Sequence, residues 1–433
     1  MSAFTQGPKT YGISAAHDDI PSILQSSDLP KPLPTNHKLI AVSSQNGNQS
    51  ASGMNIFQIA TGSSAGCVKP NSVYIRAKIV PSGGTTGHTW SFNGPSKSAS
   101  SLINRLSILV SNQMVEQINF YDKLHDVLLL HAANKNYYDN DSFLLEHTQG
   151  VNSANGSNLP IDAVSSIDVV IPLVSGLFSG AKAVPLFLLQ SPINVQVDWN
   201  TATAGIVCAD ASGPTGFTVQ NPQLVYEVIQ PDDQYVQGVR AMMAEGRLFQ
   251  LNLTSFMNLQ TASTQTLAYN IGANLSSIKG ALWTEYTNAP AQTTNTLFTS
   301  NGLSNARLFL DGVQVNNYNI DSFPTMHCEL ARCLHNMFDS TLTSVDPSNY
   351  HNQSFSCGIN CNKFNNEAMA MTGTSAQQVQ VYLEHNASAQ GYPIVAGSAS
   401  TTVSFSTAFN TFISLIYDSI VVIDVAGAVS LVK

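Results

Sequence analysis

Charged residues are scarce in this chain of 433 residues. They make up 10% of it, with 18 Lys and Arg against 27 Asp and Glu, whereas about a quarter of an average soluble protein is charged. The net charge of −9 and the lack of any basic run argue against direct nucleic-acid binding, which needs clustered cations to neutralise phosphates. The polar surface must come from Asn, Gln, Ser and Thr. Such a surface suits a protein whose flanks face other copies of itself.

We expect no segment that directs the chain across or into a membrane. The N-terminus has no charged stretch followed by an apolar one, and six cysteines in 433 residues are no disulfide framework. We therefore expect synthesis in a reducing compartment, the cytoplasm. The apolar stretch Phe412 to Val432 is long enough for a membrane span. Asp418 and Asp424 lie inside it, however, and its β-branched residues and Gly427 predict two consecutive strands instead.

Motifs of catalysis and cofactor binding are missing, and we expect neither an enzyme nor a cofactor. One pattern, GSSAG at Gly62 to Gly66, matches the nucleophile elbow of hydrolases. That elbow needs a helix directly after the serine, and Pro70 follows too closely for one to start. The carboxylates are scattered along the chain, so no catalytic pair is identified.

A cluster of cysteines and histidines is the one candidate for a metal site. It comprises His327, Cys328, Cys333, His335, Cys357 and Cys361. Their spacings, Cys-x4-Cys and Cys-x3-Cys, are looser than those of zinc ribbons. Buried thiols and polar loop histidines are the simpler interpretation. We assign no metal site and leave open whether Cys328, Cys333, Cys357 and Cys361 bind a metal.

Strand patterns dominate what the sequence does contain. From Ile193 to Trp199 apolar and polar residues alternate strictly, which places one face of a strand in a core. The preceding stretch, Val169 to Leu189, predicts two further strands, and its Pro172 and Pro185 favour strand starts and sheet edges. Strands and helices do not alternate along the chain. We therefore expect an all-β protein with antiparallel sheets.

Two helices interrupt these strands. Residues 122–130 predict a short one, and residues 231–246 a second, with Pro231 in the first turn, Asp232 and Asp233 near the N-terminus, and Gly246 at the end. The second helix lies near the middle of the chain and is interpreted as a connector. Its apolar face, which includes two methionines, is expected to pack on the β domains rather than to bind a partner.

Two hairpins indicate an internal repeat. NRLSILVSNQM at residues 104–114 and NARLFLDGVQV at residues 305–315 share Asn, Leu and Gln at an offset of 201 positions. Their turn pairs, Ser111-Asn112 and Asp311-Gly312, fall within one position of each other. The offset is close to half the chain length, which predicts two similar β domains in tandem. We expect an extended arm at residues 1–36, a first domain at 37–230, the helix at 231–246, and a second domain at 247–433.

Four stretches resemble the double-jelly-roll major capsid proteins of tailless icosahedral DNA viruses. That lineage includes tectivirus-like phages, adenoviruses, polinton-like viruses and large nucleocytoplasmic viruses. The similar stretches are Arg105 to Ile118, Val169 to Trp199, Gln223 to Leu253 and Leu415 to Leu431. They are pattern-level similarities spanning most of residues 38–433. The Ser-Asn turn departs from the Gly-Gly turn frequent in large-virus members, which leaves the virus group open.

The resemblance implies two tandem antiparallel jelly-roll sandwiches with a short connecting helix. It implies a viral major capsid protein that forms homotrimeric, pseudo-hexameric capsomers, and these join neighbouring capsomers in an icosahedral virion shell. Penton and minor capsid proteins are further expected partners, and an internal membrane is left open. The alternative is a tandem β-sandwich module that binds a receptor or a glycan. Such a module should show clustered aromatic residues in its loops, and the single pair Tyr137-Tyr138 is thin evidence for such a cluster.

Overall fold

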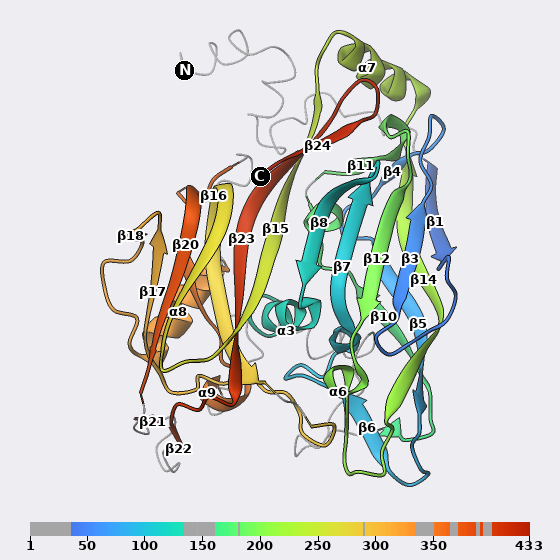
Figure 1. Cartoon of the computed structure of the whole chain (residues 1–433). Coiled ribbons are helices and arrows are strands. Elements are labelled where there is room, and N and C mark those ends of the chain that lie inside the picture. The colour runs from blue at the N-terminus through green and yellow to red at the C-terminus, as the bar shows by residue number, and fades with distance from the viewer. Residues whose placement is uncertain are drawn as a thin grey trace, which may run out of the picture.

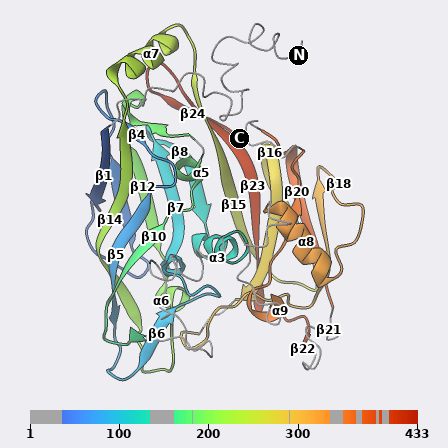
Figure 2. The ribbon, with the colours of Figure 1, turned by 180° about the vertical axis from the view of Figure 1, so that it is seen from behind.

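The chain forms two β-sandwiches that stand side by side and are joined at one end by helix α7 (Asp233–Ala244) (Figure 1, Figure 2). The computed structural model describes residues 36–133, 145, 161–180, 182–288, 291–334, 350–363, 371–386, 390–392 and 401–433. The expected N-terminal arm, apart from Asn36, lies outside the described residues.

The first sandwich consists of two facing antiparallel sheets. The strands of the larger sheet are β1 (Asn36–Ser43), β2 (Gln49–Ser50), β4 (Cys67–Val68), β5 (Tyr74–Ser82), β10 (Ile167–Pro172), β11 (Val184–Pro185) and β14 (Gly216–Gln230). Their order is β10-β5-β14-β4-β11, with β1 and β2 also paired to β14. The strands of the second sheet are β3 (Met54–Ile59), β12 (Ile193–Trp199), β7 (Ile103–Val110) and β8 (Gln113–Asn119). Their order is β3-β12-β7-β8. A small sheet of β13 (Ile206–Cys208), β6 (Thr89–Phe92) and β9 (Ile161–Asp162) lies at one end.

Alternating strands build the core of the first sandwich. In β12 the side chains of Ile193, Val195, Val197 and Trp199 are buried and the intervening residues are half-buried, as the alternation predicts. The opposite sheet contributes Ile75 and other apolar residues to the same core. The Trp199 indole N–H donates a 2.6 Å hydrogen bond to Asn55 Oδ1 on β3, so its polar atom is satisfied inside the core.

The second sandwich is one continuous sheet whose strands are ordered β15-β23-β16-β20-β17-β18. Its strands are β15 (Phe249–Ala262), β16 (Thr266–Thr287), β17 (Leu303–Leu310), β18 (Val313–Gln314), β19 (Cys357–Asn360), β20 (Thr374–His385), β23 (Phe409–Ile423) and β24 (Val429–Val432). Strand β19 pairs with β16, and β24 pairs with β23. Two short strands, β21 (Gln390–Tyr392) and β22 (Thr401–Val403), pair separately.

Strand β16 joins the parts of this sheet. Its residues up to Ile278 pair with β20, and those from Ile278 onward pair with β23, with register shifts between. In the sequence, Gln265 to Ile271 and Ile278 to Tyr286 each have the pattern of a separate strand. They are one strand because the irregular registers bend it without breaking it.

The predicted turns and helices are present. Both hairpin turns have positive φ at both central residues, 50° and 63° at Ser111 and Asn112 and 48° and 80° at Asp311 and Gly312, which fits the twist of a two-residue hairpin. Helices α3 (Tyr121–His131) and α7 match the two predicted helices. Helix α8 (Phe323–Cys333) and the short α9 (Tyr350–Gln353) were not predicted.

The apolar C-terminal stretch forms strands β23 and β24, as predicted, with Gly427 at a φ of +71° between them. Among the residues that the structure describes, no helix is long and apolar enough to cross a membrane.

The stretch from Val169 to Leu189 differs in part from the prediction. Pro172 and Pro185 end β10 and β11 rather than starting them. These strands lie at opposite ends of the sheet path, which agrees with the preference of proline for edges. The residues after β11 form a 3-10 turn, η4 (Leu186–Leu188), instead of a strand. The whole run from Val184 to Leu189 is buried. A continuous apolar run of this kind has no alternation, so its pattern does not distinguish a strand from a helical turn.

Candidate functional site between the two sandwiches

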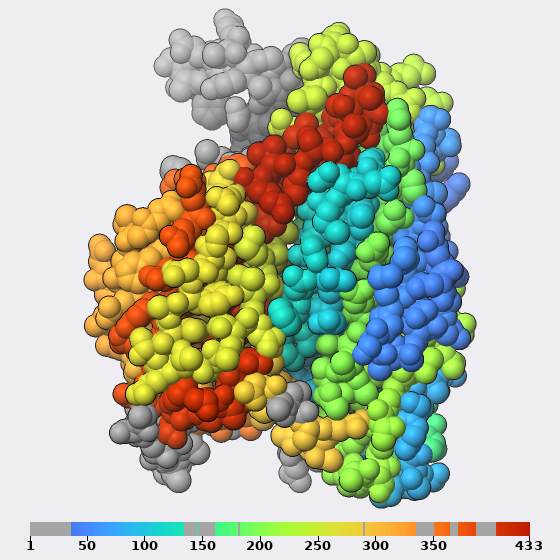
Figure 3. Space-filling view, viewed as in Figure 1, coloured from blue at the N-terminus to red at the C-terminus, as the bar shows by residue number. Residues whose placement is uncertain are grey.

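The candidate functional site is the contact between the two sandwiches, since it sets their relative orientation. The larger apolar core runs across this contact and includes Leu282, Tyr286 and Phe412 of the second sandwich. A separate core fills the rest of the second sandwich. Figure 3 shows the red C-terminal segment, which includes β24, lying against the upper end of the cyan segment of the first sandwich. The Ser111 hydroxyl between β7 and β8 donates to the Gly427 carbonyl before β24 at 3.3 Å.

A buried carboxyl group lies at the centre of this contact. Glu116 on β8 accepts hydrogen bonds from the Ser175 hydroxyl at 2.5 Å, the Gly176 N–H at 2.8 Å and the Ser255 hydroxyl at 3.0 Å. Ser175 caps the short helix α5 (Gly176–Ser179), and Ser255 belongs to β15 of the second sandwich. Burial raises the pKa of Glu116, and the hydrogen bonds from Ser175, Gly176 and Ser255 partly oppose that rise.

Helix α5 and β15 touch through their backbones. A Cβ atom on Gly176 would lie 2.3 Å from the carbonyl oxygen of Thr254. This approach is closer than any side chain allows, so only glycine fits at this position. Residues 176–179 form a helical turn, and its N-cap residue Ser175 and first residue Gly176 supply a hydroxyl group and an N–H group to Glu116.

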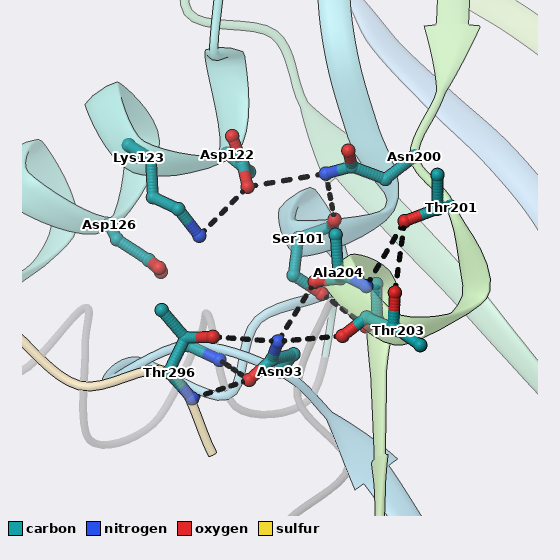
Figure 4. A network of polar contacts seen from close by, with 12 residues as sticks. Asn93, Ser101, Asp122, Lys123, Asp126, Asn200, Thr201, Thr203, Ala204 and Thr296 are labelled. Atoms are coloured by element: carbon teal, nitrogen blue, oxygen red, sulfur yellow. Dashed lines mark hydrogen bonds and ion pairs between the residues drawn. The ribbon is translucent and has the colours of Figure 1, made fainter. Parts of the chain in front are cut away.

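A second polar network joins the sandwiches near helix α6 (Ala202–Gly205) (Figure 4). The Asn93 side chain accepts a 2.7 Å hydrogen bond from the Thr296 N–H and donates to the Thr296 hydroxyl at 3.0 Å. The same amide donates to the carbonyl oxygens of Thr203 and Ala204 at 3.3 and 3.1 Å. The Asn93 side chain is 1% exposed. Through its N–H donors and its carbonyl acceptor this one buried amide connects three segments of the chain.

Helix α3 carries ionisable groups into the same region (Figure 4). Lys123 pairs with Asp122 at 3.0 Å and lies 4.9 Å from the ring centre of Tyr286 in the second sandwich. Asn200 donates to Asp122 at 3.2 Å and to the Ser101 carbonyl at 2.8 Å. The Asp122–Lys123 ion pair is buried, and its contacts with Asn200 and Tyr286 hold the two side chains in one geometry.

One turn further along α3, Asp126 accepts a hydrogen bond from the Ser96 hydroxyl. Burial raises the pKa of Asp126 to about 7, against the opposing effects of Lys123 and Ser96. Lys97 lies nearby, and burial lowers its pKa to about 8. Burial thus shifts the pKa values of both Asp126 and Lys97 so that their uncharged forms are favoured. This reflects the low polarity of the contact rather than a reacting pair.

The end of α3 reaches the second sandwich through His131. Its Nε2 lies 3.0 Å from the carbonyl oxygen of Ser354, between α9 and β19. The Tyr350 ring of α9 packs edge-on against His131 and against His327 of α8, with ring centres 6.2 and 5.4 Å away.

The nucleophile-elbow pattern does not form an elbow. Ser64 lies in the turn region between β3 and β4, and strand β4, not a helix, follows.

The candidate zinc ligands do not gather into a site. Within the described part of the chain no three Cys, His, Asp or Glu side chains are arranged to hold a metal ion, and His335 lies outside that part. Cys333, Cys357 and Cys361 are buried where α8 covers β19. Burial raises the pKa of all three thiols, that of Cys361 to about 12. These three thiols pack between α8 and β19.

The residues that join the sandwiches were not identified from the sequence. Glu116 lies on a predicted strand, where a carboxylate usually faces water, and no local pattern marks it as buried. Asn93 directly follows β6, in a segment rich in Gly, Ser and Thr that has the pattern of a loop. Their burial depends on contacts with residues more than 130 positions away, Ser255 and Thr296.

Known proteins were compared with the chain by sequence and by structure. No family model and no curated protein matches the sequence. Among solved structures, PBCV-1 VP54 fitted into a reconstruction of the virophage Sputnik has a TM-score of 0.61 at 14% identity, covering 92% of this chain and 97% of that chain. The chain has the fold of viral major capsid proteins. The Faustovirus major capsid protein has a TM-score of 0.56 at 7% identity, covering 95% of this chain and 94% of its own.

The mavirus major capsid protein has a TM-score of 0.50 at 10% identity and covers 91% of this chain and 89% of its own. The two sandwiches joined by α7 are therefore the tandem antiparallel jelly rolls that the resemblance implied. At these identities the likeness concerns the fold.

Proposed function

We propose that the protein is the major capsid protein of an icosahedral DNA virus and is located in the virion capsid. One observation carries the proposal: the match to the Faustovirus major capsid protein covers 95% of this chain and so includes both sandwiches. The composition supports it, because a chain in which only 10% of the residues are charged offers little repulsion between neighbouring copies.

The proposed assembly unit is a homotrimer that joins neighbouring capsomers. Each chain has two similar lobes side by side (Figure 1), so three chains around a threefold axis give six lobes and a pseudo-hexagonal outline. Penton and minor capsid proteins are proposed as further partners, and cytoplasm of the host cell as the place of synthesis. The net charge of −9 disfavours direct contact with the genome.

Domain limits belong to the same proposal. They are an N-terminal arm at residues 1–36, the first jelly roll at 37–230, the connecting helix at 231–246 and the second jelly roll at 247–433. The described strands support the two inner limits, since β14 ends at Gln230 and β15 begins at Phe249.

The decisive experiment is the mass and shape of the purified protein in solution. Light scattering should give three times the chain mass of 46.3 kDa, and negative-stain images should show particles of hexagonal outline. A stable monomer that binds to a glycan array would overturn the proposal and favour the receptor- or glycan-binding module.

A pair of variants tests where copies meet. Leu39 is 65% exposed on β1, which among the described strands pairs only with β14 and lies on the flank away from the second sandwich. Leu39→Asp should lower the trimer fraction at a given concentration without changing the melting temperature of the monomer. Val425→Asp is the matched control, because Val425 is 68% exposed but lies in the turn before β24. An equal loss of trimer in both variants would rule out a specific flank contact.

A further inference from the structure

The two sandwiches repeat the same edge strand and the same hairpin. Strand β1 pairs antiparallel with β14, and β15 pairs antiparallel with β23. The two pairings start alike, since Asn36 lies opposite Gln230 and Phe249 lies opposite Ile423, the last residues of β14 and β23. The first sandwich also has the β7–β8 hairpin, and the second has the β17–β18 hairpin. Each sandwich therefore carries one edge strand and one hairpin that correspond in the two halves of the chain.

Inside the chain, the hairpin of the first sandwich meets the edge strand of the second. Glu116 of β8 accepts the hydrogen bond of Ser255 on β15 at 3.0 Å. The Asn258 side chain of β15 donates to the carbonyl oxygen of Asn119, the last residue of β8, at 2.7 Å. This contact joins an edge strand to a hairpin of the neighbouring sandwich, and it is well satisfied by hydrogen bonds.

The reciprocal contact does not form within one chain. The β17–β18 hairpin and β1 lie on the two opposite outer flanks of the molecule (Figure 1, Figure 2). Among the strands that the structure describes, β1 pairs with β14 alone and β18 with β17 alone. A hairpin and an edge strand whose counterparts are in contact thus both face outward.

The two outward elements are suited to each other. Leu39 of β1 is 65% exposed and Val313 of β18 is 69% exposed, so each flank presents an apolar side chain to solvent. Lys38 lies beside Leu39, and Asp311 lies in the turn before β18; both are exposed. Contact between unlike flanks brings opposite charges together, whereas contact between like flanks would bring equal charges together.

We propose that the β17–β18 hairpin of one copy lies against β1 of the next copy, as the β7–β8 hairpin lies against β15 within the chain. The inference rests on the proposed homotrimer and specifies which surfaces hold it together. Because the contact joins unlike flanks, every copy keeps one flank for the following copy, and a threefold rotation closes the ring. Around that ring, six sandwiches meet through contacts of one kind, three within chains and three between them.

Cross-linking of the full chain tests this contact. The double variant Leu39→Cys with Val313→Cys is treated with a short bis-maleimide and separated under denaturing conditions. Species of two and three chains should form, about 100-fold faster than in the single variants. The reason is that a thiol held in the contact has an effective concentration in the roughly millimolar range. Leu39→Cys alone and Val313→Cys alone retain the native thiols, including the half-buried Cys67 and Cys328, and should remain single chains.

Leu39→Cys with Val425→Cys is the matched control for two introduced thiols. Val425 is 68% exposed but lies in the turn before β24, away from the β17–β18 hairpin. This variant should show no bridging beyond that of the single variants. Light scattering before the reaction gives the native mass of each variant.

The outcomes separate this inference from the proposed function. A native mass of three chains without bridging between positions 39 and 313 would overturn the contact and leave the capsid proposal standing. Bridging of Leu39→Cys alone into pairs of chains would show that like flanks meet, which also overturns the contact. A native mass of one chain would contradict both proposals.

Discussion

Glu116 on β8 accepts a 3.0 Å hydrogen bond from the hydroxyl of Ser255 on β15, so a single buried carboxyl group links the two sandwiches. Both side chains are almost fully buried, at 2% and 1% exposed. The same carboxyl group holds α5 through Ser175 and Gly176. Three elements of the chain therefore depend on one acidic side chain.

Replacing Glu116 should reveal its role through the pH dependence of stability. Glu116→Ala leaves the Gly176 N–H and the Ser255 hydroxyl without their acceptor, and the free energy of unfolding should fall by about 1–3 kcal/mol. Because the pKa of Glu116 is raised in the folded protein, its contribution is present at low pH and is lost as the pH rises through that pKa.

Glu116→Gln is nearly isosteric and does not ionise, so it should gain stability relative to the wild type between pH 5 and pH 8. Urea unfolding at both pH values measures this difference. A difference between variant and wild type that is the same at both pH values would contradict the raised pKa.

Asn93→Ala should weaken the second polar contact between the sandwiches. The substitution leaves the buried Thr296 N–H without its 2.7 Å acceptor and the Ala204 carbonyl without its donor. We expect a loss of about 1–3 kcal/mol in the free energy of unfolding. Asn270→Ala removes an exposed amide that is bonded only to Gln380 in the described contacts, and it should change stability by less than about 0.5 kcal/mol. Equal losses in the two variants would show that Asn93 has no special role.

Gly176→Ala should force α5 away from β15. Its Cβ would lie 2.3 Å from the Thr254 carbonyl oxygen, and such overpacking lowers stability by about 1–3 kcal/mol. Gly238→Ala is the matched control on exposed α7, where a new Cβ meets nothing within 4 Å. That change should raise stability by up to about 1 kcal/mol, because alanine favours a helix. The melting temperatures of the two variants should therefore move in opposite directions.

The cysteines should differ in their reaction with a thiol reagent. Cys328 is half-buried, whereas Cys333, Cys357 and Cys361 are buried and have raised pKa values. Cys328 should be modified in the native protein, and the other three only after unfolding, as judged by peptide mass spectrometry. Rapid native labelling of Cys357 would contradict the packing of α8 on β19.

Elements that are specified by a few neighbouring residues could be predicted from the sequence. Strand β12 followed from its alternation, the two hairpins from Ser111-Asn112 and Asp311-Gly312, and α7 from the acidic residues at its start and Gly246 at its end. Helix α8 was not predicted, although Ser322 and Thr325 form a capping box at its start. The concentration of Cys and His in that segment directed the interpretation toward metal binding instead.

The candidate site was much less predictable than the fold. Val115 and Glu116 are adjacent on β8 and both are buried. The register between β7 and β8 shifts at Val115, which interrupts the alternation of the strand, and Glu116 is bonded to Ser255 of β15, over 130 positions further along the chain. No pattern in the neighbourhood of Glu116 contains that information.

The sequence by itself determined the all-β class, the hairpin turns, the connecting helix and the resemblance to capsid proteins, because side-chain periodicity and backbone preference act over a few residues. Only the tertiary structure decided that β16 is a single strand and that Glu116, Asn93 and His131 lie between the sandwiches. Burial and hydrogen bonding there depend on which distant segments meet. The free energy of a buried polar group is set by those partners and not by its neighbours in sequence.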